Sequence, residues 1–285
     1  MGVPFSPIVR RQRLGVELRT LRDARALTGR QVVEQLGWRS QSKLTRIEKG
    51  ASRVEVGDVL DLLDLYGVTG AEREKLVVIA REAADRRALG RSIPGVGDRQ
   101  RGYAQIESGA ALIREYTQFL VPGLLQTPEY TRARIGSGVD VQEGVDVDID
   151  ARARELRQEL LVRSTPPRYE AVIEECALRR AVAPPPTMRN QLRHLLTVAE
   201  LPHVSVRVLL MDRPVANFFV PHSSFSIYRF ADPDDPTVVV LETLTSDVGI
   251  RDRDETEPYE VVYDWVKKAS LSEESTLRMI RTLVE

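Results

Sequence analysis

The chain has 285 residues, which is long enough for two domains. Hydrophobic residues make up 42% of it and charged residues 29%, the balance of an ordinary folded soluble protein. Its single cysteine, Cys176, excludes an internal disulfide and a cysteine-rich zinc site. Apolar runs extend over only a few residues, so we expect no signal peptide, no membrane span and a cytoplasmic, nucleoid-associated protein.

The net charge of −1 conceals an uneven distribution. Residues 1–53 hold twelve Arg or Lys and four Asp or Glu, a net charge of +8, so the rest of the chain carries −9. A basic head on an acidic body is typical of a protein that presents one end to phosphates. The charge pattern therefore favours a nucleic-acid partner for the first domain.

Residues 31–50 predict two short helices joined by a tight turn. The hydroxyl of Thr28 can cap the first helix, and Gly37 can end it in the left-handed conformation. Ser40 or Ser42 can cap the second helix, which a further glycine ends. Short capped helices around a tight turn are typical of a helix-turn-helix unit.

Polar residues cover the outward face of the second predicted helix. Arginine pairs well with guanine in the major groove and glutamine with adenine, whereas lysine and threonine suit phosphates. The alternative is a solvated face on an ordinary helical hairpin. We favour DNA binding, with the outward residues Gln41, Ser42, Lys43, Thr45, Arg46 and Lys49.

Residues 14–80 resemble the helix-turn-helix of Xre/Cro-type regulators, the fold of phage repressors. The residues that carry the resemblance are Leu14, Leu18, Leu21, Arg22, Gln31, Gly37, Ser40, Gln41, Ser42, Arg46, Ile47, Glu48 and Gly50. The resemblance implies base contacts from Gln41, Ser42 and Arg46 and a phosphate contact from Gln31. Between Gly37 and Glu48 the chain is one residue longer than the family pattern, and we place the extra residue at Arg39 in the turn. This insertion leaves open which of Ser40, Gln41 and Ser42 reaches a base.

Leu14, Leu18 and Leu21 recur at helical spacing and predict a first helix over residues 10–26. Two further amphipathic helices, at 54–66 and 71–89, complete a predicted five-helix DNA-binding domain over residues 1–89. The glycine-rich stretch 90–102 is predicted to be a linker. Residues 103–285 mix helical and alternating patterns, so we predict an α+β domain. Its expected strands lie at 168–173, 204–211, 225–230 and 237–244, and its main helices at 128–135, 150–163, 188–200, 255–268 and 272–284. Residues 107–118 are expected to be helix, or helix followed by a strand at 112–117.

Residues 103–284 resemble the uncharacterised effector domain of actinobacterial Xre-type regulators. The resemblance is carried by the run 121–130, by Glu107, Ala111, Glu175, Leu178, Arg179, Arg180, Gln191, Leu192, Phe225 and Glu242, and by residues 269–275. That family is described as antitoxin-like, and such regulators often lie beside a gene for a small companion protein. The resemblance implies neither a ligand nor a reaction.

The turn at 122–126 and the helix start at Thr127 offer free backbone N–H groups, a natural place for an anion or a partner carboxylate. We therefore predict effector or partner contacts at Gln126 and Thr127. The competing interpretation is that this segment only seals the core through its apolar side chains.

Glu242 ends a strand that we expect to be buried, and a buried carboxylate must be paired or perturbed. It is therefore the third candidate contact residue of the second domain, with a salt bridge to an arginine as the alternative. The three histidines are isolated, so we predict no metal site, no cofactor and no catalytic residue.

These patterns favour a transcription regulator that binds double-stranded DNA as a homodimer and is controlled through its second domain, with no membrane partner. A single recognition helix covers only a few base pairs, which is why two are expected. An enzyme domain with an attached DNA-binding head is one alternative. An antitoxin-like domain that docks a small companion protein is the other.

Overall fold

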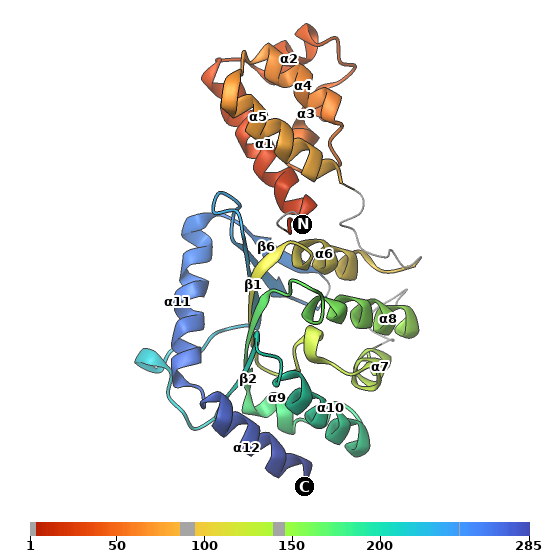
Figure 1. Cartoon of the computed structure of the whole chain (residues 1–285), viewed down its shortest axis with the longest axis vertical. Coiled ribbons are helices and arrows are strands. Elements are labelled where there is room, and N and C mark those ends of the chain that lie inside the picture. Colours follow the sequence, from red (N-terminus) through yellow and green to blue (C-terminus); the bar gives the residue numbers. More distant parts are fainter. Residues whose placement is uncertain (1–3, 86–94, 139–145, 245) are drawn as a thin grey trace. The chain divides into compact units, whose positions relative to one another are not determined.

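The computed structural model describes residues 4–85, 95–138, 146–244 and 246–285, and it contains two compact units (Figure 1). Unit 1 comprises residues 1–90 and the short segment 231–236, and unit 2 comprises residues 91–230 and 237–285. Each unit has a hydrophobic core of its own.

Unit 1 is the predicted five-helix domain. Its first helix begins at Pro7, three residues before the expected start, because the Ser6 hydroxyl accepts from the backbone N–H of Val9 at 3.4 Å. A proline in the first turn has no N–H to leave unsatisfied, so it suits this position. The helices are α1 (Pro7–Ala24), α2 (Gly29–Gln35), α3 (Gln41–Glu48), α4 (Val56–Leu65) and α5 (Gly70–Ala84).

The core of unit 1 uses the apolar positions that the helical spacing predicts. Leu14 and Leu18 of α1 are completely buried, and Leu44 and Ile47 of α3 pack into the same cluster. Burial of such side chains is worth roughly 1.5–3 kcal/mol each, so it supplies most of the stability of short helices. The other members of the cluster are Val32, Val54, Val59, Leu62, Leu63, Tyr66, Val68, Leu76, Ile79, Ala80 and Ala83.

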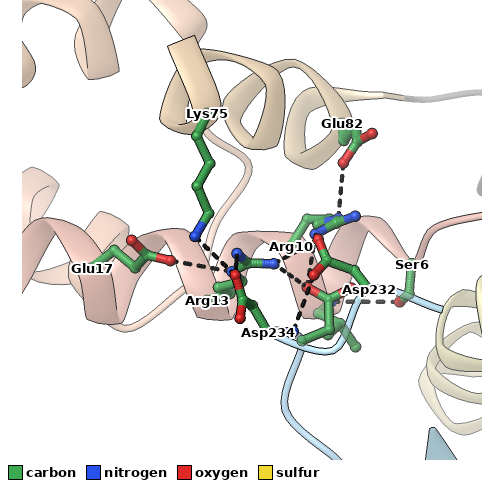
Figure 2. Close-up of polar contacts among 10 residues, drawn as sticks. Ser6, Arg10, Arg13, Glu17, Lys75, Glu82, Asp232 and Asp234 are labelled. Atoms are coloured by element: carbon green, nitrogen blue, oxygen red, sulfur yellow. Dashed lines mark hydrogen bonds and ion pairs between the residues drawn. The ribbon is translucent and has the colours of Figure 1, made fainter. Parts of the chain in front are cut away.

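An acidic segment of unit 1, residues 231–236, lies against α1 (Figure 2). Arg10 donates to Asp232 at 2.7 Å and to Asp235 at 2.8 Å, and Arg13 contacts the same two carboxylates at 2.8 and 3.1 Å. Burial raises the pKa of Asp232, but hydrogen bonds from Arg10, the backbone and Arg13 outweigh it and hold that pKa well below its usual range. These two arginines of the basic head are therefore held by carboxylates of this segment.

Unit 2 is built on one mixed sheet of six strands in the order β3-β2-β1-β4-β5-β6. Strands β1, β2 and β3 are parallel, and β4, β5 and β6 continue the sheet in antiparallel pairs. The α+β class predicted from the sequence is confirmed. The strands are β1 (Ala110–Thr117), β2 (Arg168–Glu174), β3 (Val204–Leu209), β4 (Phe225–Phe230), β5 (Val238–Glu242) and β6 (Asp247–Ile250).

Helices cover both faces of this sheet (Figure 1). On one face α11 (Arg253–Ala269) packs over β1, β3 and β5, where Tyr116, Phe225, Tyr263 and Val266 form a buried cluster. The other face carries α6 (Asp98–Glu107), α7 (Pro128–Gly136), α8 (Val147–Gln158), α9 (Glu175–Arg179) and α10 (Pro185–Val198), and α12 (Glu273–Val284) packs on α10 and β3.

Some elements differ from the sequence-based expectation. Helix α6 begins at Asp98, inside the stretch 90–102 that was expected to be a linker, and residues 86–94 lie outside the described ranges. Strand β6 was not predicted, because its four residues are too few to show an alternating pattern. The first three residues of β5, Val238, Val239 and Val240, are buried, as expected for this strand.

Candidate functional site

Helix α3 is fixed to α1 by an ion pair and by a close backbone contact. Arg22 donates from Nε to Oε1 of Glu48 at 2.6 Å and from Nη2 to Oε2 at 3.3 Å. The hydrogen bonds to Glu48 raise the pKa of Arg22. A Cβ atom at Gly15 would lie 2.5 Å from the carbonyl oxygen of Glu48, so only glycine allows the two helices to approach this closely.

The start of α3 is held from the other side by Lys43. Its ammonium group lies 2.5 Å from Oδ1 of Asp58 and 4.2 Å from the centre of the Trp38 ring. Lys43 therefore has partners within unit 1 that help to orient α3, and its expected contact with DNA stays a prediction.

The other outward residues of α3 are exposed together. Gln41, Ser42, Thr45, Arg46 and Lys49 are all exposed, at spacings of one, three and four residues that place them on one side of the helix. The hydroxyl of Thr45 donates to the Gln41 carbonyl at 3.1 Å, which orients it toward the helix backbone. This side of α3 offers amide, hydroxyl and guanidinium groups, the types that read base edges and phosphates.

The turn before α3 has the geometry that its residues indicated. Gly37 ends α2 with φ at 64°, a left-handed conformation that glycine adopts without strain. Arg39 and Ser40 in the turn are exposed, and Ser40 precedes α3 without a side-chain capping bond. Both remain available for contacts outside the chain.

The Gln31 side chain helps to cap the start of α2, which the sequence analysis did not predict. The backbone N–H of Thr28 donates to its Oε1 at 2.8 Å, while the hydroxyl of Thr28 accepts from its backbone N–H. Thr28 and Gln31 thus form a capping box at the start of α2. The amide of Gln41 lies directly over Gly29 in the same turn, so the starts of α2 and α3 meet there.

In unit 2, the helix start at Thr127 is not open to an anion. The backbone N–H of Thr127 donates to Oε1 of Gln191 at 2.7 Å, and its hydroxyl accepts from Tyr130 N–H at 3.2 Å. Leu124, Leu125 and Tyr130 are buried. The expectation of free N–H groups at Thr127 is therefore wrong, and the competing interpretation, a segment that seals the core, is the one that the structure supports.

Gln126 is buried in the same segment and is saturated by internal partners. Its amide donates to the Val121 carbonyl at 2.7 Å, and its Oε1 accepts from Thr131 and from Arg154 at 3.0 Å each. Glu242, by contrast, is exposed rather than buried, and it accepts from the Tyr103 hydroxyl at 3.1 Å. Neither the expected burial of Glu242 nor the alternative salt bridge is present among the described residues.

The structure nevertheless brings Gln126 and Glu242 to one cavity, of about 430 Å³, which Thr127 does not line. Arg134 and Arg154 also line this cavity, and the Nε atom of each is buried. The sequence did not single them out. Arginines on amphipathic helices usually face water, so nothing in their spacing distinguishes the inward ones. Only the packing of α7 against α8 reveals them.

Comparison with protein families agrees with this division. Residues 13–76 match a family described as a helix-turn-helix domain, and residues 100–282 match a domain of unknown function, DUF5753. No curated protein and no solved structure matches the chain. Within the described residues, no helix has the length and apolar character needed to cross a membrane.

Proposed function

Because the chain belongs to the DUF5753 family and carries a helix-turn-helix domain ahead of that region, we propose that it is a sequence-specific DNA-binding transcription regulator. The observation that carries the proposal is the exposed side of α3, which presents Gln41, Ser42 and Arg46. A helix of this width fits the major groove, where glutamine and arginine discriminate adenine from guanine.

The orientation of α3 supports the proposal. The Arg22–Glu48 pair and the Lys43–Asp58 pair fix both ends of the helix to its neighbours, so its outward residues are presented as a rigid set. Preorganised side chains lose less conformational entropy on binding than mobile ones. The net charge of +8 over residues 1–53 adds attraction to phosphates that does not depend on sequence.

The proposal includes a homodimer on DNA. One recognition helix covers few base pairs, and a dimer would place two of them about 34 Å apart, one helical turn of B-DNA. The direct experiment is a selection of bound fragments from a random DNA pool with the full chain, followed by sequencing. We expect an enriched palindrome with half-sites one turn apart. A pool without any enriched motif would contradict sequence-specific binding.

We also propose that unit 2 controls the DNA-binding unit by binding a ligand or partner and that it catalyses no reaction. A small companion protein is one such partner, and the loop 211–220 favours it, because Met211, Phe218 and Val220 are 66%, 85% and 68% exposed. Asn217 and Phe218 in this loop have φ values of 56° and 55°. Such left-handed non-glycine residues cost roughly 1–3 kcal/mol each and are concentrated at functional sites.

The companion hypothesis is tested with the product of a small open reading frame beside the gene. We expect the Phe218→Asp variant to lose binding in a pull-down while it keeps its affinity for DNA. Val162→Asp is the matched control, because Val162 is 71% exposed in another part of unit 2. Retained binding by Phe218→Asp would exclude the loop as the docking surface.

A further inference from the structure

The cavity beside α7 and α8 has the size of a small-molecule site. Its volume of about 430 Å³ lies within the roughly 300–1,000 Å³ that ligand pockets occupy. It opens between the end of β1, the following segment at 117–123, and the two helices. The residues that line it include the aromatic Tyr103 and Phe119 together with charged groups.

Four arginines line the cavity, and two of them are neutralised within the protein. Arg99 forms an ion pair with Asp247 at 2.8 Å, and Arg157 binds Glu107 through two nitrogens at 2.5 and 2.8 Å. In each pair two guanidinium nitrogens contact the two oxygens of one carboxylate, which is the forked geometry of a strong ion pair. They therefore serve as an internal comparison for the other two.

Arg134 and Arg154 have no such partner. Neither guanidinium forms an ion pair with a carboxylate among the described residues, and the Nε atom of each is buried without a hydrogen-bond acceptor. Arg154 is only 8% exposed, and within the described ranges its side chain makes one hydrogen bond, to the neutral Gln126 amide at 3.0 Å. Buried cations without a counter-ion are costly and are therefore rare in structural positions.

We infer that this cavity binds a small organic anion, with its carboxylate or phosphate held by Arg134 and Arg154 and its apolar body against the aromatic rings. An oxyanion supplies the acceptor that both guanidinium groups lack, and arginine is the side chain best suited to bind one in a fork. Glu242 and the buried Glu115 also line the cavity, and burial raises the pKa of Glu115 to about 7. Below that pH Glu115 is mostly protonated, so the two cations and Glu242 leave one net positive charge for the ligand.

The titration behaviour of the two arginines agrees with this assignment. Burial, followed by the neighbouring Arg134 and Arg157, lowers the pKa of Arg154 to about 9, and burial also lowers the pKa of Arg134. Attraction to Glu242 raises both pKa values, but burial outweighs it, so the charged form of each arginine is only partly compensated within the protein. A bound anion would provide that compensation.

The experiment is calorimetric titration of the full chain in low-chloride buffer with benzoate and phenyl phosphate, with benzamide as the neutral analogue. The two anions distinguish a carboxylate from a phosphate ligand. We expect saturable binding of at least one anion and binding of benzamide that is at least tenfold weaker. Loss of a charged hydrogen bond should weaken affinity by roughly tenfold to a hundredfold in Arg134→Met and Arg154→Met.

The chain offers a matched control for each variant two residues away on the same helix. Arg132 and Arg152 are exposed and form ion pairs with Asp148 and Glu155, so Arg132→Met and Arg152→Met should bind the anion as the unmodified chain does. Absence of saturable binding for both anions would overturn the inference. Equal losses in the control variants would do so as well.

A second measurement separates a binding role from a structural one. Removing Arg154 leaves Gln126 Oε1 with its bond from Thr131, so no buried group loses its only partner. We expect the melting temperature of ligand-free Arg154→Met to equal or exceed that of the unmodified chain. A lower melting temperature would mark Arg154 as structural and overturn its assignment. DNA is absent from both assays, so failure here is distinguishable from failure of the proposed DNA binding.

Discussion

Arg22 and Glu48 are 26 residues apart in sequence, yet Nε of the arginine lies 2.6 Å from Oε1 of the glutamate. The two side chains are 14% and 12% exposed, so the pair is largely shielded from water. It joins the last turn of α1 to the end of α3. The direction in which the outward residues of α3 point therefore depends on a contact made by a residue that is not expected to touch DNA.

We expect Arg22→Met to lower the free energy of unfolding of unit 1 by on the order of 3 kcal/mol, because it leaves the Glu48 carboxylate largely buried and unpaired. Glu48→Gln should cost less, about 1.5 kcal/mol, since Arg22 keeps its bond to the Leu27 carbonyl at 2.8 Å. Urea unfolding monitored by Trp38 fluorescence, in a Trp265→Phe background, measures both.

The control for this comparison is Arg19→Met, because Arg19 is exposed on the same helix. Its stability should change by less than about 0.5 kcal/mol. If Arg22→Met were no more destabilising than Arg19→Met, the ion pair would not be what fixes α3.

Arg46→Ala should cost roughly 1–3 kcal/mol of affinity on the selected DNA site and little on random DNA, because base contacts discriminate between sequences. Lys49→Ala should weaken binding to both DNAs alike and flatten the salt dependence, as expected of a phosphate contact. Both residues are exposed, so neither change should disturb the fold. Gel-shift titrations on the two DNAs measure these affinities. If Arg46→Ala lost the same affinity on both DNAs, Arg46 would contact a phosphate and not a base.

Gln191→Ala should destabilise unit 2 more than Thr127→Ala. The Gln191 side chain is completely buried, donates to the Leu125 carbonyl at 2.7 Å and accepts from Thr127 N–H at 2.7 Å. Its removal leaves two buried backbone groups without partners, at roughly 1–3 kcal/mol each, whereas loss of the Thr127 cap costs about 1 kcal/mol.

Urea unfolding of unit 2, monitored by Trp265 in a Trp38→Phe background, gives the ranking, with the exposed neighbour Asn190→Ala as the control. The reverse order of the two variants would show that the helix cap, not the glutamine bridge, fixes this segment.

Glu115→Gln should change how the stability of unit 2 depends on pH. Burial raises the pKa of Glu115 from 4.5 to about 7, although a hydrogen bond from Tyr169 opposes the shift. Between these values the folded unit holds a proton that the unfolded chain has released, so stability falls as the pH rises from about 4.5 to 7. The glutamine variant should lose this dependence, which amounts to at most about 1.4 kcal/mol per pH unit.

The measurement is the difference in unfolding free energy between Glu115→Gln and the unmodified chain at several pH values, again monitored by Trp265. We expect the difference to increase from pH 4.5 to 7 in favour of the variant and to stay level at higher pH. A difference that is constant across this range would mean that Glu115 is already ionised in the folded unit.

The sequence by itself was sufficient for features that depend on a few neighbouring residues. The helix start at Thr127 is confirmed, as are the capping by Thr28 and the helix end at Gly37, because caps and left-handed turns are local properties of the backbone. Helical spacing of leucines likewise predicted the buried positions Leu14 and Leu18. The five-helix domain and the α+β class follow from such patterns.

Only the tertiary structure decided which partner each polar side chain has. The sequence around Lys43 is that of a phosphate-binding lysine, and the structure shows an ion pair between Lys43 and Asp58. Glu242 ends a buried strand, yet it is exposed. Hydrogen-bond partners and burial are set by residues distant in sequence, which periodicity does not encode. For the same reason, the pair of partly compensated arginines, Arg134 and Arg154, became visible only when the helices that carry them were packed together.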